Sequence, residues 1–396
     1  MSESTDQGAT TGPGFGNYQN EIYLNGLVGE VPPFTTDLTA LGASASTRLD
    51  SGAYGYLAGS AGSGATHRAN RAAFERHRLV PRMLADAGDR DLSTTVLGTR
   101  VPAPVLLAPL GVQSIIHPDG ELATARAASA LDVPVVLSTH SSHSLEEVAE
   151  ADGEGPRWFQ LYWPNDDDVC VSILRRAAAS GYSALVVTLD TWTLAWRPQD
   201  LDQSYLPFLR GIGTAIPFSD PAFRALLAEP PEENPEAAVL AWVSMFTGRD
   251  RPWDRLPFLR EHWDGPIVLK GVLHPDDARR AADAGMDGVV VSNHGGRQVD
   301  GAVAALDALP EVVRAVGDRT EVLFDSGVRT GSDVLKALAL GARAVLYGRP
   351  YAYGLAHAGE DGVRHVLRSL LADLDLTLGL SGHRTPNELT PSDLWC

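Results

Sequence analysis

The sequence predicts a (β/α)8 barrel, and three observations lead to this prediction. From Val105 onward, short β-branched apolar runs alternate with Ala-rich stretches of helical composition, a pattern typical of parallel strands joined by helices. There are eight such runs, each separated by room for a helix, as this barrel requires. A helix-Gly-turn-strand pattern also recurs at Gly181, Gly285 and Gly341, where glycine suits the left-handed residue that ends a helix.

The strands are predicted from these runs in chain order. They are Val105–Ala108, Val135–Ser138, Trp158–Tyr162, Leu185–Asp190, Ile267–Lys270, Val289–Ser292, Val322–Asp325 and Ala344–Tyr347. After the eighth run, Gly362–Leu380 has the pattern of an amphipathic helix. We expect this helix to close the barrel.

The segment before the barrel is less regular. We expect residues 1–17 to be a disordered leader, because Met1–Gly14 has neither the basic nor the apolar region of a signal peptide. Residues 18–396 then form a single domain, in which Leu38–Ala58 has room for one or two short helices. Gly59–Gly64 superficially resembles a phosphate loop, but no strand precedes it and no Lys-Ser/Thr pair follows it. We interpret it as a flexible connector.

An insertion is predicted between the fourth and fifth strands. Gly285 and Gly341 are 56 residues apart, whereas Gly181 and Gly285 are 104 apart, an excess of 48 residues. The insertion, around 198–260, contains the Pro-rich and charged stretch Glu229–Glu236, which does not suit a core element. Because it follows the C-terminal end of a strand, it is expected on the active face of the barrel. A lid and a disordered surface loop are equally compatible with it.

Composition excludes several classes of protein. The formal net charge of -18 argues against nucleic acid or an anionic membrane as a partner, since both need a basic surface. Two cysteines, Cys170 and Cys396, cannot form a disulfide framework, and no Cys/His cluster has metal-ligand spacing, so no metal site is predicted. The reducing cytoplasm is the simplest compartment. No apolar run approaches the ~18 residues of a membrane span.

Polar residues end nearly every predicted strand, so they are expected to converge on one face of the barrel. Lys270 ends Pro-Ile-Val-Leu-Lys, where an unpaired lysine is costly to bury. We expect Lys270 either to face an anion or to become an amine of low pKa. The alternative without a functional role is that its side chain extends to solvent at the barrel rim.

The ends of the seventh and eighth strands carry a second signal. Asp325–Gly331 and Gly348–Pro350 combine glycines with Arg329 and Arg349, at the usual phosphate position of such barrels. The two arginines suit bidentate contacts to a phosphate. Either motif alone would be read as a glycine turn with a surface arginine, but together they indicate a phosphorylated cofactor or substrate.

His294 is the best candidate for a general base, because the ordinary pKa of histidine is near 6.5 and a carboxylate partner can raise it. Asp190 ends another strand and is suited to stabilise the imidazolium. A lone histidine is more often structural, but Arg297 follows His294 by three residues.

Further side chains suit an anionic substrate. Arg297 and Arg197 are appropriate for clamping a carboxylate, and Tyr56 and Tyr162 can add hydroxyl donors.

The chain resembles the family of FMN-dependent L-2-hydroxy acid oxidases and dehydrogenases. The resemblance covers roughly residues 18–390 and rests on Leu-Lys-Gly (269–271), Ser-Asn-His-Gly-Gly-Arg-Gln (292–298), Phe-Asp-Ser-Gly-Val-Arg (324–329) and Gly-Arg-Pro (348–350). Within the family the chain is most similar to lactate 2-monooxygenase, through Asn20–Tyr23, Gly26–Gly29, Leu-Asp-Thr-Trp (189–192), Trp-Arg-Pro (196–198) and Pro207–Gly211.

The resemblance implies a role for each matching residue. For catalysis and substrate binding it implies His294 as base with Asp190 as its partner, Arg297, Tyr56 and Arg197 holding the carboxylate, Tyr162 bonding the reacting oxygen, and Lys270 at the flavin N1 and O2 edge. For FMN binding it implies Pro109, Leu110, Gly111, Ser138, Gln160, Thr188, Ser292, Asp325, Ser326, Gly327, Arg329, Gly348 and Arg349. It also implies a homo-oligomer, a tetramer or an octamer.

The implied activity is oxidation of a small L-2-hydroxy acid to the 2-oxo acid, with O2 reoxidising FMN. Gly111 stands where many oxidases of the family have Ala, as in lactate 2-monooxygenase. The extra room beside the flavin favours oxidative decarboxylation of bound product. The alternatives are an oxidase that releases the 2-oxo acid and H2O2 from a larger, mandelate-like substrate, and a dehydrogenase with another acceptor. A flavin-free barrel and a non-catalytic flavin binder are less favoured.

One departure from the family's pattern bears on the substrate. His140 stands where relatives carry Trp, Tyr or Leu over the substrate side chain. We interpret His140 as a residue of the substrate-pocket wall with no chemical role.

Overall fold

The computed structural model describes residues 14–246 and 252–395, and it contains the closed barrel of eight parallel strands that the sequence predicts. Each strand lies beside its neighbour in the sequence, and β11 closes the barrel against β4. Every predicted run agrees with its strand to within two residues at each end. The strands are β4 (Val105–Leu107), β5 (Val135–Ser138), β6 (Arg157–Leu161), β7 (Leu185–Thr188), β8 (Ile267–Val272), β9 (Gly288–Val291), β10 (Glu321–Phe324) and β11 (Val345–Tyr347).

The interior of the barrel is filled by side chains. One apolar cluster joins inward-facing residues of all eight strands, among them Leu106, Trp158 and Val290. The hairpin of β2 (Thr94–Val96) and β3 (Thr99–Val101) adds Val96 and Val101 to the same cluster. The hairpin closes the end of the barrel at which the strands begin, and the packing there is apolar. A ligand therefore enters at the C-terminal ends of the strands.

Helices surround the barrel. Those that follow the strands are α5 (Gly120–Ser129), α6 (Leu145–Asp152), α7 (Asp167–Ala179), α13 (Pro275–Asp283), α14 (Ala305–Val316), α15 (Gly331–Ala339) and α16 (Arg349–Leu380). The predicted helix Gly362–Leu380 is confirmed as the second part of α16, which breaks at Ala358 and Gly359. Its buried face packs on α5 and α15.

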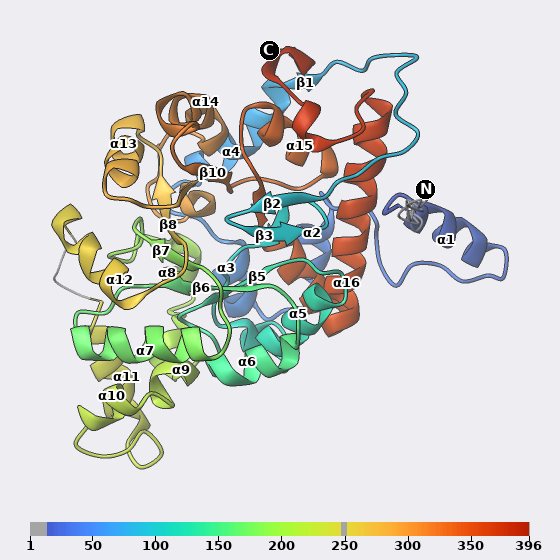
Figure 1. The fold of residues 1–396 in the computed structure, drawn as a ribbon. Helices are drawn as coiled ribbons and strands as arrows, with labels where there is room; N and C mark the ends of the chain where they lie inside the picture. The colour runs from blue at the N-terminus through green and yellow to red at the C-terminus, as the bar shows by residue number, and fades with distance from the viewer. Residues whose placement is uncertain (1–13, 247–251, 396) are drawn as a thin grey trace, which may run out of the picture.

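The N-terminal segment contains α1 (Asn17–Gly26), α2 (Leu41–Ala45), α3 (Ser51–Ala58) and α4 (Ala65–Arg76). Figure 1 shows α1 beside α16 at the edge of the molecule, away from the barrel. Residues 1–13 of the predicted leader lie outside the described residues, whereas the amide of Gly16 already donates to Asp375 at 2.7 Å. The helix α1 was not predicted from the sequence, and none of its residues is buried.

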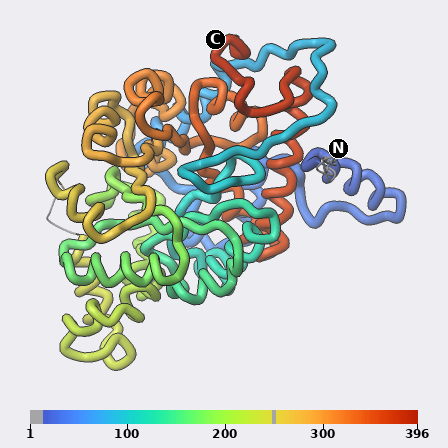
Figure 2. Tube along the Cα trace, viewed as in Figure 1, coloured from blue at the N-terminus to red at the C-terminus, as the bar shows by residue number. Residues whose placement is uncertain are grey.

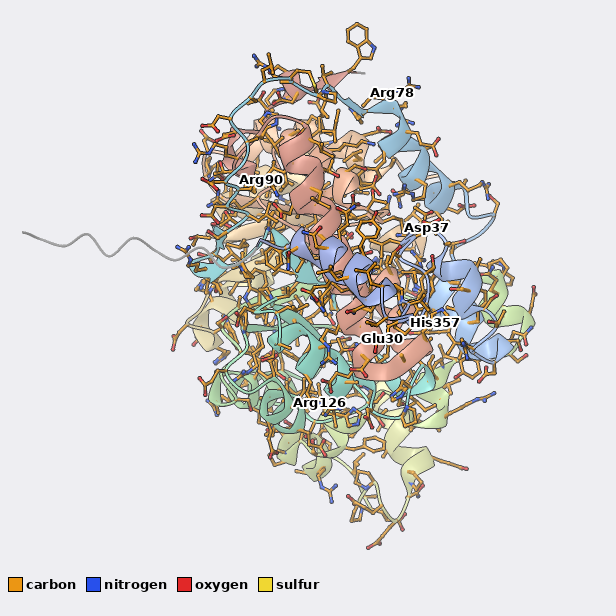
Figure 3. All side chains as sticks on the ribbon, turned by 90° about the vertical axis from the view of Figure 1, so that its right-hand side faces the viewer. Glu30, Asp37, Arg78, Arg90, Arg126 and His357 are labelled. Carbon is orange, nitrogen blue, oxygen red and sulfur yellow. The ribbon has the colours of Figure 1, made fainter. Side chains whose placement is uncertain are left out.

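Contacts with α16 position α1. Figure 3 shows α1 crossing α16, with Glu30 and His357 on the same face. His357 stacks on Phe34, with 4.6 Å between the ring centroids, and the Tyr18 hydroxyl lies 2.7 Å from Nδ1 of His365. Tertiary contacts of this kind stabilise α1, although its sequence lacks the periodic apolar residues from which a helix is predicted.

The connector Gly59–Gly64 is hydrogen-bonded to the active-site end of the barrel. The amide of Ala61 donates to Gly296, and that of Gly62 donates to Trp196, both at 2.9 Å. The carbonyl of Gly59 accepts bonds from Arg297 and Arg349. We therefore correct the interpretation of this stretch as flexible: glycines let its backbone approach the site closely.

The insertion is helical in its described residues. It contains α8 (Pro198–Asp202), α9 (Ala215–Phe218), α10 (Pro221–Ala225), α11 (Pro235–Ser244) and α12 (Leu256–His262), with short 3-10 turns at Pro207–Arg210 and Trp253–Arg255. Figure 2 shows much of this yellow-green stretch extending beyond the barrel. Residues 247–251 of the insertion lie outside the described residues.

The last described strand, β12 (Leu394–Trp395), pairs with β1 (Arg78–Leu79), which follows α4 and precedes the barrel. Among the residues that the structure describes, no helix is long and apolar enough to cross a membrane.

Candidate active site

A cavity of about 480 Å³ opens at the C-terminal ends of the strands. It brings together most of the candidate site residues that the sequence singles out. Those that line it are Tyr56, Pro109, Leu110, Gly111, His140, Tyr162, Arg197, Lys270, His294, Arg297, Asp325, Ser326, Gly327, Arg329, Gly348 and Arg349. Residues from opposite ends of the sequence therefore meet in one hollow.

His294 is paired with Asp190 at the cavity wall. Its Nδ1 lies 2.8 Å from Oδ1 of Asp190 and 3.0 Å from the Thr191 hydroxyl. When Nδ1–H donates to the carboxylate, Nε2 is left with a free lone pair, which is the arrangement of a general base. Asp190 itself lies behind His294, outside the lining of this cavity.

The electrostatics keep His294 neutral and Asp190 ionised. Burial lowers the pKa of His294 below its ordinary value, and Lys270 and Arg197 add to this effect, while Asp190 opposes it. Asp190 therefore raises the pKa of this histidine, as expected of a carboxylate partner, but burial outweighs its effect. Burial raises the pKa of Asp190, but the contacts with His294 and Lys270 lower it more.

A glycine makes room for this carboxylate. β8 bulges between Lys270 and Val272, and the intervening Gly271 has φ of +103°. A β-carbon at Gly271 would lie 2.7 Å from Oδ2 of Asp190. Any larger residue here would therefore displace the partner of His294.

Lys270 is buried and ion-paired. Its Nζ lies 2.9 Å from Oδ2 of Asp325 and 3.2 Å from the Ser292 hydroxyl. Burial lowers its pKa, but Asp325 and Asp190 more than offset this, so the pKa is raised. Of the two chemical states expected for Lys270, the structure supports the cation beside an anion and contradicts the low-pKa amine.

Two arginines, Arg197 and Arg297, and two tyrosines, Tyr56 and Tyr162, also line the cavity. Arg297 donates to the Gly59 carbonyl at 2.9 Å, and its Cζ lies 5.1 Å from the centre of the Tyr56 ring. Burial and the neighbouring Arg197 lower the pKa of Arg297 to about 10. Burial raises the pKa of Tyr56 and that of Tyr162, so both phenols remain donors. An anion between these groups would relieve the repulsion between the two cations.

A second pair of arginines, Arg329 and Arg349, also lines the cavity, and Arg349 shares the Gly59 carbonyl with Arg297. Arg349 donates to the carbonyls of Leu57, Gly295 and Gly59, and Arg329 donates to that of Val328. Within the described ranges neither makes an ion pair with a carboxylate. Burial lowers the pKa of Arg349 to about 9 and also lowers the pKa of Arg329. The buried Arg349 and the half-buried Arg329, both without a carboxylate partner in the described ranges, suit a phosphate beside Gly327 and Gly348.

Some predicted cofactor ligands lie beneath the cavity floor and do not line it. The amide of Gln160 donates to the Thr188 hydroxyl at 3.0 Å, and the Ser138 hydroxyl accepts from the amide of His140 at 3.2 Å. The Ser292 hydroxyl accepts from the amide of His294 at 3.0 Å. All four side chains are buried, so in this structure they support the residues above them.

The room that the sequence predicts beside Gly111 is occupied. A β-carbon at Gly111 would lie 2.8 Å from the main-chain oxygen of His140 and 3.0 Å from its Cβ. The same oxygen accepts a bond from Val112 at 2.8 Å. Glycine at 111 therefore allows the two loops to approach each other closely, and the vacated space is filled by His140.

The insertion contributes apolar residues that sequence analysis did not identify one by one. They are Leu206, Phe208, Trp242, Val243 and Phe246, and Ile115, Ile116, Trp192 and Leu194 complete the apolar lining. A single sequence gives no signal for them, because an apolar residue at the cavity looks the same as one in the core. Two of the quoted motifs pointed to this group, Pro207–Gly211 through Phe208 and Leu-Asp-Thr-Trp (189–192) through Trp192.

Comparisons with known proteins agree with this geometry. A family model described as FMN-dependent dehydrogenase matches residues 45–396. An FMN-dependent alpha-hydroxy acid dehydrogenase of Penicillium citrinum is 52% identical over 375 residues, covering 94% of this chain and 93% of the relative. An L-lactate oxidase of Lysinibacillus sphaericus is 40% identical over 362 residues, covering 91% of this chain and 93% of the relative.

A solved structure of a mandelate oxidase superposes with a TM-score of 0.80 at 39% identity, covering 91% of this chain and 98% of that one. The fold, the cavity and these relatives lead to one conclusion. The chain belongs to the FMN-dependent dehydrogenase family, uses FMN as its cofactor and oxidises 2-hydroxy acids.

Proposed function

We propose that this protein is an oxidase for a 2-hydroxy acid with an aromatic or similarly bulky apolar side chain, and that it releases the 2-oxo acid and H2O2. The observation that carries the proposal is the aromatic wall on the substrate side of the cavity. His140 lies 4.4 Å from Phe208, 5.0 Å from Tyr162 and 5.4 Å from Phe246 between ring centroids. Such a wall has a large apolar surface and suits a planar apolar group.

The wall lacks the charge that a polar side chain would require. Burial lowers the pKa of His140 to about 4, so its ring is neutral at physiological pH. Phe208 and Phe246 come from the insertion, as does Trp242, which packs edge-on against Phe246 at 4.7 Å. The structural likeness to a mandelate oxidase supports the same substrate size.

The residues present fit FMN. The half-buried Arg329 and the buried Arg349 are cations without a carboxylate partner in the described chain, and would hold the phosphate. Lys270 would lie along the polar edge of the ring, and Pro109–Gly111 would pass its reactive face. When bound, FMN accepts the two electrons that the substrate loses and passes them to O2.

The chain's own residues would bind the substrate and take its proton. Arg297 and Arg197 would hold the carboxylate, with Tyr56 packed against Arg297. Nε2 of His294 would accept the proton that the substrate loses, while Asp190 stabilises the imidazolium. The protonated Lys270 would stabilise negative charge that develops nearby.

Oxidative decarboxylation, as in a monooxygenase, is the second candidate outcome. It is favoured by glycine at position 111, whereas the main chain of His140 in the vacated space favours release of the oxo acid. Which product forms is decided by whether the oxo acid leaves before O2 reacts.

An anaerobic comparison of substrates tests the proposal. The holoenzyme would be mixed with L-lactate, with a branched aliphatic 2-hydroxy acid and with L-mandelate, and flavin bleaching would be followed. We expect the ratio of the flavin reduction rate constant to the substrate dissociation constant to be about 10-fold or more higher for mandelate than for lactate, because an aryl group buries several additional carbons. A preference for lactate would overturn the proposed substrate class. Aerobic assay of H2O2 against CO2 then decides the product.

A further inference from the structure

We propose that Asn70, on α4 and outside the cavity, is a positioning residue that holds His294 in place by pairing its side-chain amide with that of Asn293. The inference rests on the proposed function, in which His294 is the base. Neither Asn70 nor Asn293 lines the cavity, and their exposed fractions are 2% and 4%.

The two amides form a reciprocal pair. Nδ2 of Asn70 donates to Oδ1 of Asn293 at 2.8 Å, and Nδ2 of Asn293 donates to Oδ1 of Asn70 at 2.7 Å. The pair joins residues that are 223 positions apart in the chain. Buried amide pairs need every donor and acceptor matched, because an unpaired polar group inside a protein is costly.

Backbone groups fix the orientation of both amides. The amide of Ala305 donates to Oδ1 of Asn70, and the amide of Gly296 donates to Oδ1 of Asn293, both at 3.1 Å. Nδ2 of Asn293 also donates to the Val303 carbonyl at 3.1 Å. Turning either amide around would place a donor against a donor at one of these backbone groups. The pair therefore has one arrangement only.

The pair stabilises a loop with an unfavourable backbone. His294, Gly295 and Gly296 have φ of 56°, 65° and 77°, and a left-handed conformation is uncommon for histidine. Asn293 caps this turn by accepting the bond from Gly296. On the other side, the Ser326 hydroxyl accepts from the amides of Asn293 and Gly295 at 3.2 and 3.0 Å.

The position of the turn determines the reach of the base. Because His294 follows Asn293 directly, a shift of Asn293 moves the imidazole relative to Asp190 and to the cavity. Asn70 also contacts the loop after β10, since a β-carbon at Gly327 would lie 3.1 Å from its Cβ. Asn70 thus connects the loop that carries His294 to α4 and to the loop after β10 that contains Gly327.

Asn70→Asp is the variant that tests this role. Aspartate keeps the shape of the side chain and the acceptor for Ala305, but it loses the donor to Asn293 and places a carboxylate oxygen against Oδ1. Turning the amide of Asn293 to meet the carboxylate would leave Gly296 without its acceptor. The strain is therefore passed to the turn that carries His294.

Thr66→Val is the matched control. Thr66 is also buried on α4, and its hydroxyl donates to Val299 and accepts from Ala302 at 2.8 and 2.9 Å. Valine keeps its shape and loses both bonds. This variant therefore loses two hydrogen bonds between α4 and residues 299–302, and it leaves the turn at His294 untouched.

Both variants would be purified with FMN, and their FMN content and thermal midpoints measured. Anaerobic rapid mixing then gives the rate constant of flavin reduction and the dissociation constant of the substrate. For Asn70→Asp we expect the rate constant to fall about 10- to 100-fold, as for a misplaced catalytic group, with the dissociation constant changed less than about threefold. For Thr66→Val we expect the rate constant to stay within about twofold. Equal rate losses in the two variants, or an unchanged rate in Asn70→Asp, would overturn the proposal.

The same substitution in the His294→Ala background separates the two proposals. If Asn70 acts through His294, Asn70→Asp lowers the residual reduction rate of His294→Ala by less than about twofold. An equal fold loss in both backgrounds would overturn the role of Asn70 and leave that of His294 intact. Normal reduction by His294→Ala alone would overturn the base itself, and with it both proposals.

Discussion

The main chain of His140 occupies the space that a side chain at Gly111 would need. The two residues belong to the loops after β5 and β4, and the bond from Val112 to the His140 oxygen joins these loops. Position 111, next to the expected flavin, is therefore coupled to a residue of the substrate wall. Substitution of either residue is expected to act on the other.

Gly111→Ala should change the choice of substrate. The new β-carbon would lie 2.8 Å from the His140 oxygen, so the His140 loop must shift and the Val112 bond weakens. We expect the free energy of unfolding to fall by about 1–3 kcal/mol, as for other overpacked sites. We also expect the kcat/KM for mandelate divided by the kcat/KM for lactate to change at least fivefold. Differential scanning calorimetry and steady-state kinetics measure the two effects. An unchanged ratio would show that the two positions are independent.

His140→Phe should leave the chemistry intact and change the side-chain preference. His140 is neutral above pH 5, because its pKa is about 4, and Phe keeps the tilted ring contacts with Phe208 and Tyr162. We expect kcat for the preferred substrate to change less than about 10-fold, and the pH profile above pH 5 to remain as in the parent. A loss of about 1,000-fold in kcat would instead assign His140 a chemical role.

The barrel could be predicted from the sequence because its strands are buried on both faces. Runs such as Val289–Ser292 and Val322–Asp325 therefore consist of consecutive apolar residues, and the polar residue that ends each run marks the mouth of the barrel. His294, Lys270 and Arg349 could be singled out as candidates by the same reasoning, and the structure places all three at the cavity.

Other features have no local signal. The helix α1 is fixed by Asp375 and His365, more than 300 residues away in the chain. The net direction of the His294 pKa shift depends on burial and on two cations from other elements, Lys270 of β8 and Arg197 before α8. The pairing of Lys270 with Asp325 depends on strand register around the barrel. Such properties follow from tertiary packing and become visible only in the folded chain.

Arg297→Lys should weaken substrate binding more than it slows the reaction. The guanidinium donates to Gly59 and packs over the Tyr56 ring, and a lysine cannot do both while also holding a carboxylate with two bonds. We expect the substrate dissociation constant to rise about 10- to 100-fold, with a smaller fall in the reduction rate constant. Arg319→Lys is the control, since Arg319 pairs with Asp283 on the surface. Equal dissociation constants in Arg297→Lys and the parent would contradict the clamp.

Asp190→Asn should lower the reaction rate and move its pH dependence. His294 can accept a proton only when neutral, so kcat/KM is expected to be full above the pKa of His294 and to fall as the pH drops through it. That pKa already lies below 6.5 because of burial, and the negative charge of Asp190 is the main group raising it. Removing the charge lowers the pKa further, and the acid limb must shift to lower pH.

The plateau rate of Asp190→Asn should fall by about 100- to 10,000-fold, because the imidazolium loses its counter-charge and Asn can bond the wrong tautomer. Anaerobic flavin reduction from pH 4.5 to 9 measures the limb and the plateau, with FMN content as the check on folding. An acid limb that moves to higher pH would mean that another group titrates there. A plateau equal to that of the parent would remove Asp190 from the mechanism, even though its oxygen lies 2.8 Å from the ring.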